Sequence, residues 1–293
     1  MNWLKVQIDI DAARVAPLEA MLSACGAVSI DLGNAADEPI LEPVPGATPL
    51  WARTRLTALF EPTVGEAAVR LAVASVTDPA APPSTTFSVV ENEDWIGKMR
   101  DALVPLRFGS GLWVCPPGKS SPDARATTIT MEPGLAFGTG MHPTTALCMK
   151  WLAANPPVGL TVLDFGCGSG ILGIAGLALG AASVIAVDID PQALTAARDN
   201  ALRNAAGDRL TVMAPDELRE SDSFDVLLAN ILSGTLIDLA PVLRRHCRTG
   251  AALALSGILT EQAAAVADAY GDWCVLNAVR DFEGWVLMTG TAR

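Results

Sequence analysis

A glycine-rich loop between two short apolar segments carries the residue types best suited to binding a ligand. Residues 161–163 lead directly into Asp164, and a second apolar segment, 183–187, ends at Asp188. The glycines that follow the first acid at alternate positions are Gly166, Gly168 and Gly170. Glycines let the backbone approach a ligand closely, and an acid at the end of a strand can accept hydrogen bonds from both ribose hydroxyls. The pattern therefore indicates half of a nucleotide-binding α/β fold.

Two cofactors are compatible with this loop. The segment from Gly168 to Gly173 fits the dinucleotide fingerprint G-x-G-x-x-G, which taken alone is a weak signal. Its phase argues against a dehydrogenase, because the glycines begin at Gly166, two residues after Asp164. A dinucleotide site also needs helix N-terminal N–H groups that are free to hold phosphate. Asp-x-Gly-x-Gly-x-Gly instead resembles motif I of S-adenosylmethionine (SAM) methyltransferases, where the glycines make room for the methionine part and the acid meets its ammonium group.

Two alternative explanations of this segment involve no ligand. Residues 165–187 contain no charged side chain, as in a membrane span, but six glycines, an acid at each end and no basic flank disfavour that reading. A buried βαβ unit without a ligand is the other, and acids at both strand ends disfavour it.

Composition restricts the class of protein. The 293 residues suffice for two domains, and 51% hydrophobic residues can supply a large core. Six cysteines without a C-x-x-C pair indicate a reduced, cytoplasmic protein, and with only two histidines we expect no metal. A net charge of −12 disfavours direct nucleic-acid binding and suits either solubility or a cationic protein partner.

The N-terminal residues predict a small α+β domain over 1–90. The order strand, helix, strand, strand, helix, strand suggests a ferredoxin-like fold, for which recognition or packing is the default role. The expected strands are 1–10, 27–32, 51–60 and 86–90, and the expected helices are 16–25 and 63–76. Amphipathic spacing from Glu91 to Val104 predicts a connecting helix, and we assign the linker to 91–108.

From residue 109 to 293, strands alternate with helical patterns. This alternation predicts a parallel, doubly wound, Rossmann-like α/β sheet that binds its ligand at the carboxyl ends of the strands. Asp164, Asp188 and Asn230 each follow a strand and are expected to share one crevice. The expected strands are 161–163, 183–187, 210–213, 224–229 and 251–255, with two closing strands at 273–279 and 285–289.

The segment before this sheet is a second candidate for function. Glycines surround Phe137, which indicates either a lid over the cofactor or a capped loop with one buried aromatic side chain. Thr144 or Thr145 is expected to cap the following helix, with Pro143 near its start. His142 is either a proton acceptor or a hydrogen-bonding residue that holds the loop. Asn230 either orients a substrate amine and contacts the cofactor, or is an ordinary turn residue.

Taken together, four segments resemble the bacterial methyltransferases of large-subunit ribosomal protein L11. The segments are 133–145, 164–170, 188–191 and 230–232. The resemblance implies a class I, SAM-dependent protein methyltransferase that modifies lysine amines and the N-terminal α-amine of L11. It also implies that the small domain grips the ribosomal protein and that the linker lets the domains reorient. We expect a monomer without membrane contact.

The resemblance also implies roles for single residues. The cofactor site comprises Thr145, Asp164, Gly166, Gly168, Gly170, Asp188 and Asn230, with Phe137 and Gly138 in the covering loop. Asn230 and His142 are the candidates for catalysis. Three alternatives remain open: a small-molecule methyltransferase on the same fold, a SAM-binding scaffold without catalysis, and a nicotinamide dehydrogenase.

Overall fold

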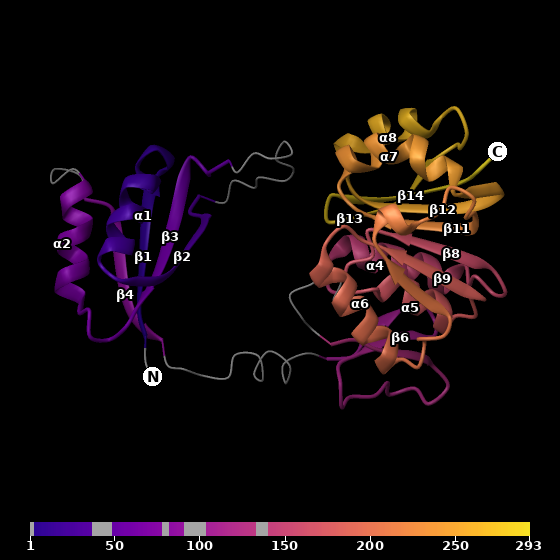
Figure 1. The fold of residues 1–293 in the computed structure, drawn as a ribbon, viewed down its shortest axis with the longest axis horizontal. Coiled ribbons are helices and arrows are strands. Elements are labelled where there is room, and N and C mark those ends of the chain that lie inside the picture. The colour runs from indigo at the N-terminus through magenta and orange to yellow at the C-terminus, as the bar shows by residue number, and fades with distance from the viewer. Residues whose placement is uncertain (1–2, 37–48, 78–81, 91–103, 133–139) are drawn as a thin grey trace. The chain divides into compact units, whose positions relative to one another are not determined.

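The computed structural model describes residues 3–36, 49–77, 82–90, 104–132 and 140–293. The chain divides into two compact units, Met1–Trp95 and Ile96–Arg293 (Figure 1). Each unit has its own buried core, and each is described by itself.

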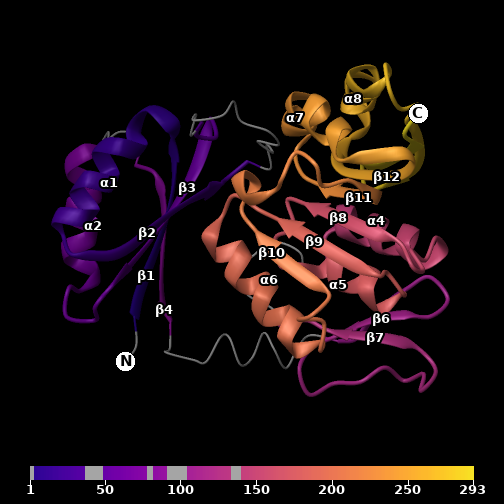
Figure 2. The same cartoon turned by 45° about the vertical axis from the view of Figure 1, so that its right-hand side comes forward.

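The N-terminal unit is an antiparallel four-stranded sheet with two helices on one face (Figure 2). The strands lie in the order β2-β3-β1-β4. Its elements are β1 (Trp3–Asp11), α1 (Val15–Ala24), β2 (Ala27–Asn34), β3 (Arg53–Phe60), α2 (Glu66–Val76) and β4 (Ser84–Val90). The predicted order of strands and helices is therefore observed in the described residues.

Alternation along β1 explains this arrangement. Val6, Ile8 and Ile10 are buried and pack with apolar residues of α1 and α2. Successive side chains of a strand point to opposite faces, so the residues between them face away from the helices. Asp9 there forms a bidentate ion pair with Arg55 of the neighbouring strand, with both N–O distances at 2.7 Å.

The second unit is built on a seven-stranded sheet in the order β10-β9-β8-β11-β12-β14-β13. The strands are β8 (Thr161–Phe165), β9 (Ser183–Val187), β10 (Leu210–Met213), β11 (Phe224–Asn230), β12 (Cys247–Leu259), β13 (Asn277–Phe282) and β14 (Trp285–Thr291). The first five in this order are parallel, whereas β14 runs antiparallel to both β12 and β13. The five strands that were expected to be parallel are parallel, whereas the closing strands expected at 273–279 and 285–289 are observed at Asn277–Phe282 and Trp285–Thr291 and pair antiparallel. A tight turn at Glu283 and Gly284, both with positive φ, joins these two strands into a hairpin, which forces antiparallel pairing.

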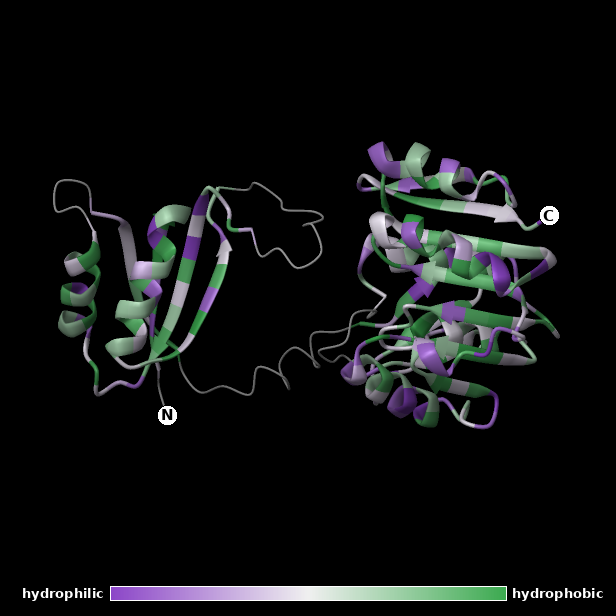
Figure 3. Cartoon of the chain, turned by 45° about the horizontal axis from the view of Figure 1, so that its top comes forward, coloured by the Kyte–Doolittle hydropathy of each residue, from purple (hydrophilic) through white to green (hydrophobic). Residues whose placement is uncertain are grey.

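Helices cover both faces of this sheet. Val162 and Val226 share one apolar cluster with the helices α4, α5 and α6, while Leu163 and Leu227 share another with α7 and α8. Figure 3 shows the strongly hydrophobic character of these strands, as expected for a sheet buried on both sides. The helices are α4 (Pro143–Ala154), α5 (Ile171–Ala178), α6 (Pro191–Arg203), α7 (Ser233–Arg245) and α8 (Ala263–Tyr270).

A small sheet of β5 (Leu106–Phe108), β6 (Leu112–Cys115) and β7 (Thr127–Thr130) completes the unit. It corrects the predicted linker helix over 91–108, because residues 106–108 form a strand. Phe108 is buried, and Gly109, with φ +61°, allows the turn back toward β6. Residues 91–103 of the predicted helix lie outside the described residues. Among the helices that the structure describes, none combines the length and apolar character needed to span a membrane.

Candidate functional site

The glycine loop follows β8 and is closed against β9. The N–H groups of Gly166 and Cys167 both donate to the carbonyl of Val187, at 2.7 and 3.0 Å. Gly166, Gly168 and Gly170 have φ of +74°, +54° and +78°, a region that disfavours side chains. A Cβ on Gly166 would also lie 2.2 Å from Cγ2 of Ile231, so the loop requires glycine for space as well as for conformation.

Asp188 at the end of β9 is oriented by two backbone donors. Its Oδ2 accepts from the Gly168 N–H at 2.8 Å, and its Oδ1 accepts from the Asp190 N–H at 3.0 Å. Asp190 in turn caps α6 by accepting from the Gln192 N–H at 2.8 Å. The Asp188 carboxylate is partly exposed, and each of its oxygens keeps a further lone pair for a ligand hydroxyl.

Asp164 lies beneath the same loop and is fully buried. Its Oδ2 accepts from the Gly173 N–H at 2.8 Å, but its Oδ1 has no partner among the described residues. Burial raises the pKa of Asp164 to about 7; the Gly173 bond opposes this shift, and the charge of Asp188 adds to it. A buried acceptor without a donor is costly, so this oxygen suits a ligand that supplies a cationic N–H group.

Asn230, at the end of β11, lies against Thr145 of α4. Its Nδ2 donates to the Thr145 Oγ1 at 3.3 Å, whereas its Oδ1 is buried without a partner in the described part of the chain. The chain after Asn230 is held by β12, because the Ile231 N–H donates to the Ser256 carbonyl at 3.2 Å. A Cβ on Gly257 would lie 2.2 Å from the Ile231 carbonyl oxygen, so this close backbone contact needs glycine.

His142 is the N-cap of α4, which corrects the prediction that Thr144 or Thr145 has this role. The Thr144 N–H donates to its Nδ1 at 3.4 Å, and the Thr144 Oγ1 lies 2.8 Å from the same nitrogen. Burial lowers the pKa of His142, and Glu283 opposes this shift. A neutral imidazole has one acceptor nitrogen, and here the cap uses it. The geometry therefore favours the loop-holding interpretation over the proton acceptor.

A cavity of about 280 Å³ opens beside Asn230. Its lining is largely apolar and consists of His142, Thr144, Asn230, Ile231, Leu232, Gly257 and Trp285. The rings of His142 and Trp285 meet edge to face, with centroids 5.2 Å apart at an angle of 67°. Sequence reasoning identified Trp285 only as the start of a strand, because no spacing connects it to the distant loop and only the hairpin of β13 and β14 brings it there.

The predicted site residues thus form two adjoining groups. Asp164, Asp188 and the loop glycines form one; His142, Thr145 and Asn230 form the other. Ile231 connects them, because it lines the cavity and closely approaches Gly166. Phe137 and Gly138 lie outside the described residues.

A family model and curated relatives match this chain over nearly its full length, and a solved structure matches about two thirds of it. A family model described as "Ribosomal protein L11 methyltransferase" matches residues 2–293. A ribosomal protein L11 methyltransferase of Pseudomonas savastanoi pv. phaseolicola is 46% identical over 294 residues, covering 100% of both chains. Another of Hahella chejuensis is 43% identical over 290 residues, covering 99% of this chain and 98% of the relative. A crystal structure of a ribosomal protein L11 methylase from Lactobacillus delbrueckii subsp. bulgaricus has a TM-score of 0.58 at 30% identity, covering 64% of this chain and 98% of its own.

Proposed function

The chain belongs to the family of ribosomal protein L11 methyltransferases, and we propose that it methylates lysine side-chain amines and the N-terminal α-amine of L11, with SAM as the donor. One observation from the structure supports this proposal. A glycine loop with an unpaired buried carboxylate oxygen adjoins an apolar cavity with an unpaired buried amide oxygen, and both elements touch Ile231.

The first group of residues fits the donor. The glycines allow the positive φ angles of the loop, Asp188 offers lone pairs to hydroxyls, and the unpaired oxygen of Asp164 suits the ammonium of a methionine moiety. When bound, SAM supplies a methyl group on a positively charged sulfur. Asp164, Asp188 and the three glycines of the loop are therefore assigned to cofactor binding, together with Thr145.

The second group fits an amine acceptor. A lysine amine is charged in water, with a pKa of about 10.4, and burial in an apolar cavity favours its neutral, nucleophilic form. The Asn230 Oδ1 is placed to accept one N–H of that amine and so orient its lone pair. Trp285 and Leu232 offer apolar surface to the aliphatic stem of a lysine. His142 is assigned the helix cap and one wall of this cavity.

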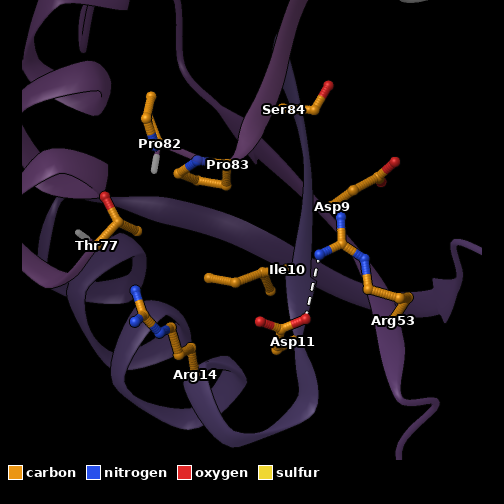
Figure 4. A pocket seen from close by; sticks show the side chains of 9 residues that line it. All are labelled: Asp9, Ile10, Asp11, Arg14, Arg53, Thr77, Pro82, Pro83 and Ser84. Carbon is orange, nitrogen blue, oxygen red and sulfur yellow. Dashed lines mark hydrogen bonds and ion pairs between the residues drawn. The ribbon is translucent and has the colours of Figure 1, made fainter. Parts of the chain in front are cut away.

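The N-terminal unit is proposed to be a ferredoxin-like domain, over 1–90, that recognises the protein substrate. The strand order supports the fold, and a polar cavity of about 280 Å³ supports the role. Figure 4 shows this cavity, which is lined by Arg14 and by the ion pair of Asp11 with Arg53, at 3.1 Å. The catalytic domain is assigned to 109–293. We further propose that the protein is a monomer in the cytoplasm. Its net charge of −12 agrees with the proposal that it does not contact nucleic acid directly.

Asn230→Ala tests the assignment of the acceptor cavity. We expect the rate of methyl transfer to L11 to fall by roughly a hundredfold, because the orienting acceptor is removed, while SAM still binds. Turnover is followed with radiolabelled SAM and binding by calorimetry, with Asn155→Ala at the exposed end of α4 as the control. Transfer at the wild-type rate in N230A contradicts the assignment, and no transfer to L11 by the wild-type protein overturns the proposed function.

A further inference from the structure

One buried polar residue outside the predicted site contacts the glycine loop. Asn200 lies inside α6 and is only 2% exposed. Asparagine is a poor helix former, and a buried amide destabilises a fold unless it is hydrogen-bonded. Its presence at this position is therefore explained by the bonds that its side chain makes.

The Asn200 amide joins two segments that are far apart in sequence. Its Nδ2 donates to the Ser169 carbonyl at 3.0 Å, between Gly168 and Gly170. Its Oδ1 accepts from the Glu132 N–H at 3.2 Å, at the last described residue before 133–139. Asp188 holds the Gly168 N–H at 2.8 Å, so the peptide groups on either side of the Gly168–Ser169 peptide are held by different side chains.

We propose that Asn200 is a positioning residue for the methyl donor, which fixes the glycine loop relative to the chain at Glu132. This inference rests on the proposed function, because it takes the glycine loop as the SAM site. Asn200 acts through the backbone of Ser169 and Glu132, and the donor itself is contacted by the loop.

The chain offers a matched control one turn along the helix. The Asn204 Oδ1 accepts from the Thr130 N–H, and its Nδ2 donates to the Thr130 carbonyl, both at 2.7 Å. Asn204 therefore ties the end of α6 to the same segment as Asn200 does, but its side chain has no described bond to the glycine loop. Its Nδ2 also donates to the Asn200 carbonyl at 2.8 Å, so removing it tests the loss of contacts at the end of α6 that do not include the glycine loop.

Calorimetric titration of the full-length chain with SAM, without L11, tests the inference. In Asn200→Ala we expect the Kd for SAM to rise roughly tenfold, the scale of one or two lost hydrogen bonds. Asn204→Ala is expected to change it by less than about twofold, although thermal unfolding detects a loss of stability in both variants. Equal Kd values for N200A and the wild type, or an equal loss in N204A, overturn the inference.

Asn200→Asp separates hydrogen bonding from space filling. An ionised carboxylate of the same shape still accepts from Glu132, but it cannot donate to the Ser169 carbonyl until it is protonated. We expect the ratio of Kd values, N200D to wild type, to fall toward 1 as the pH is lowered from about 8 to about 5.5. Asp188 and the 3.6 Å pair of Arg203 with Glu132 are common to both proteins, and so is Asp164, whose pKa is about 7. Their direct effects on SAM binding cancel in the ratio, and they act on it only through the pKa of the introduced carboxyl group.

A ratio that does not change with pH overturns the assigned bond to Ser169. The binding assay also separates the two proposals. A wild-type chain that fails to bind SAM overturns the proposed function and this inference together, whereas wild-type binding with unchanged affinity in N200A and N200D overturns only the role of Asn200.

Discussion

Asp164 and Asn230 each keep one buried oxygen without a hydrogen-bond partner among the described residues. An unsatisfied buried acceptor costs about 1–3 kcal/mol, and most buried polar groups in folded proteins avoid that cost. Both oxygens belong to residues at the carboxyl ends of parallel strands, where doubly wound sheets bind ligands. The free energy lost at these two atoms in the ligand-free fold can therefore be recovered on binding a ligand that supplies N–H donors.

Asp164→Asn tests the buried carboxyl group. Because burial raises the pKa of Asp164 from 3.8 to about 7, the folded chain holds this proton more tightly than the unfolded chain does. The wild-type protein therefore loses stability as the pH rises from about 4 to about 7, and a neutral amide is free of this loss. We expect the Tm of D164N minus that of the wild type to grow between about pH 5 and pH 8. A Tm difference between D164N and the wild type that does not change with pH would contradict the raised pKa of Asp164.

His142→Asn distinguishes a helix cap from a proton acceptor. Asparagine is a good N-cap, whereas alanine is not, and the difference is typically about 1 kcal/mol. We expect H142N to keep most of the thermal stability and most of the methylation rate, while His142→Ala loses stability. Thermal unfolding and initial rates at saturating SAM measure the two effects. Equal and large losses of rate in both variants would instead identify a proton acceptor.

At the residue level, the glycine loop was predictable because its backbone needs glycine, with φ of +74°, +54° and +78° at Gly166, Gly168 and Gly170. The prediction of the helix cap was wrong because threonine is a preferred N-cap residue and histidine is not, so residue type favoured Thr144 or Thr145. The choice depends on backbone angles, and His142 has the extended conformation of a cap, with φ −68° and ψ 138°. The pairing of Asn200 with Ser169 joins residues 31 apart, and no periodic pattern indicates it.

At the scale of elements, the buried parallel strands were the most predictable, because their apolar runs are bounded by polar residues. The observed bounds of β9 and β10 coincide with the prediction. The strand β7 was missed because Thr127–Thr130 contains one apolar residue and lies in a sheet of short strands. The strand β12 is longer than predicted because Ser256 is buried and donates to the Val286 carbonyl at 3.1 Å, which hides the continuation of the strand.

Gly257→Ala tests the contact between the chain after β11 and β12. The added Cβ would lie 2.2 Å from a backbone oxygen of Ile231, so the two strands must separate. Gly118→Ala is the matched control, because Gly118 has a similar φ of +79° but open space around it. We expect G118A to lose about 1 kcal/mol and G257A at least about 2 kcal/mol more, together with most SAM-dependent activity. Similar Tm values for the two variants would contradict the steric argument.

At the scale of the whole molecule, the sequence predicted two domains, and the chain divides into two compact units. The last three residues of the predicted linker helix, 106–108, form a strand of the second unit, because Phe108 packs in the apolar core of that unit. Pattern alone could not show this, since a leucine and a phenylalanine at alternate positions are too few residues to define a period.

Arg14→Glu tests substrate recognition by the N-terminal unit. Arg14 lines the polar cavity of Figure 4, away from the glycine loop in sequence and in a different compact unit. We expect the KM for L11 to change severalfold with an unchanged Kd for SAM, because the proposed contact with the protein substrate is made at this cavity. Arg244→Glu on the exposed side of α7 makes the same change of charge in the other unit and serves as the control. Equal effects of the two variants on the KM would show that net charge alone is responsible.

Methyl transfer to L11 can be measured from the mass of the intact substrate. Purified, unmethylated L11 is incubated with the full-length chain and SAM, and free lysine is offered in a parallel reaction. We expect a ladder of L11 masses that rises by one CH₂ unit for each methyl group. Peptide mapping should place these groups on lysine side chains and on the N-terminal amine, and the mass of free lysine should not change. An unchanged L11 mass, with SAM binding verified in the same sample, would contradict the account, and methylated free lysine would point to a small-molecule acceptor.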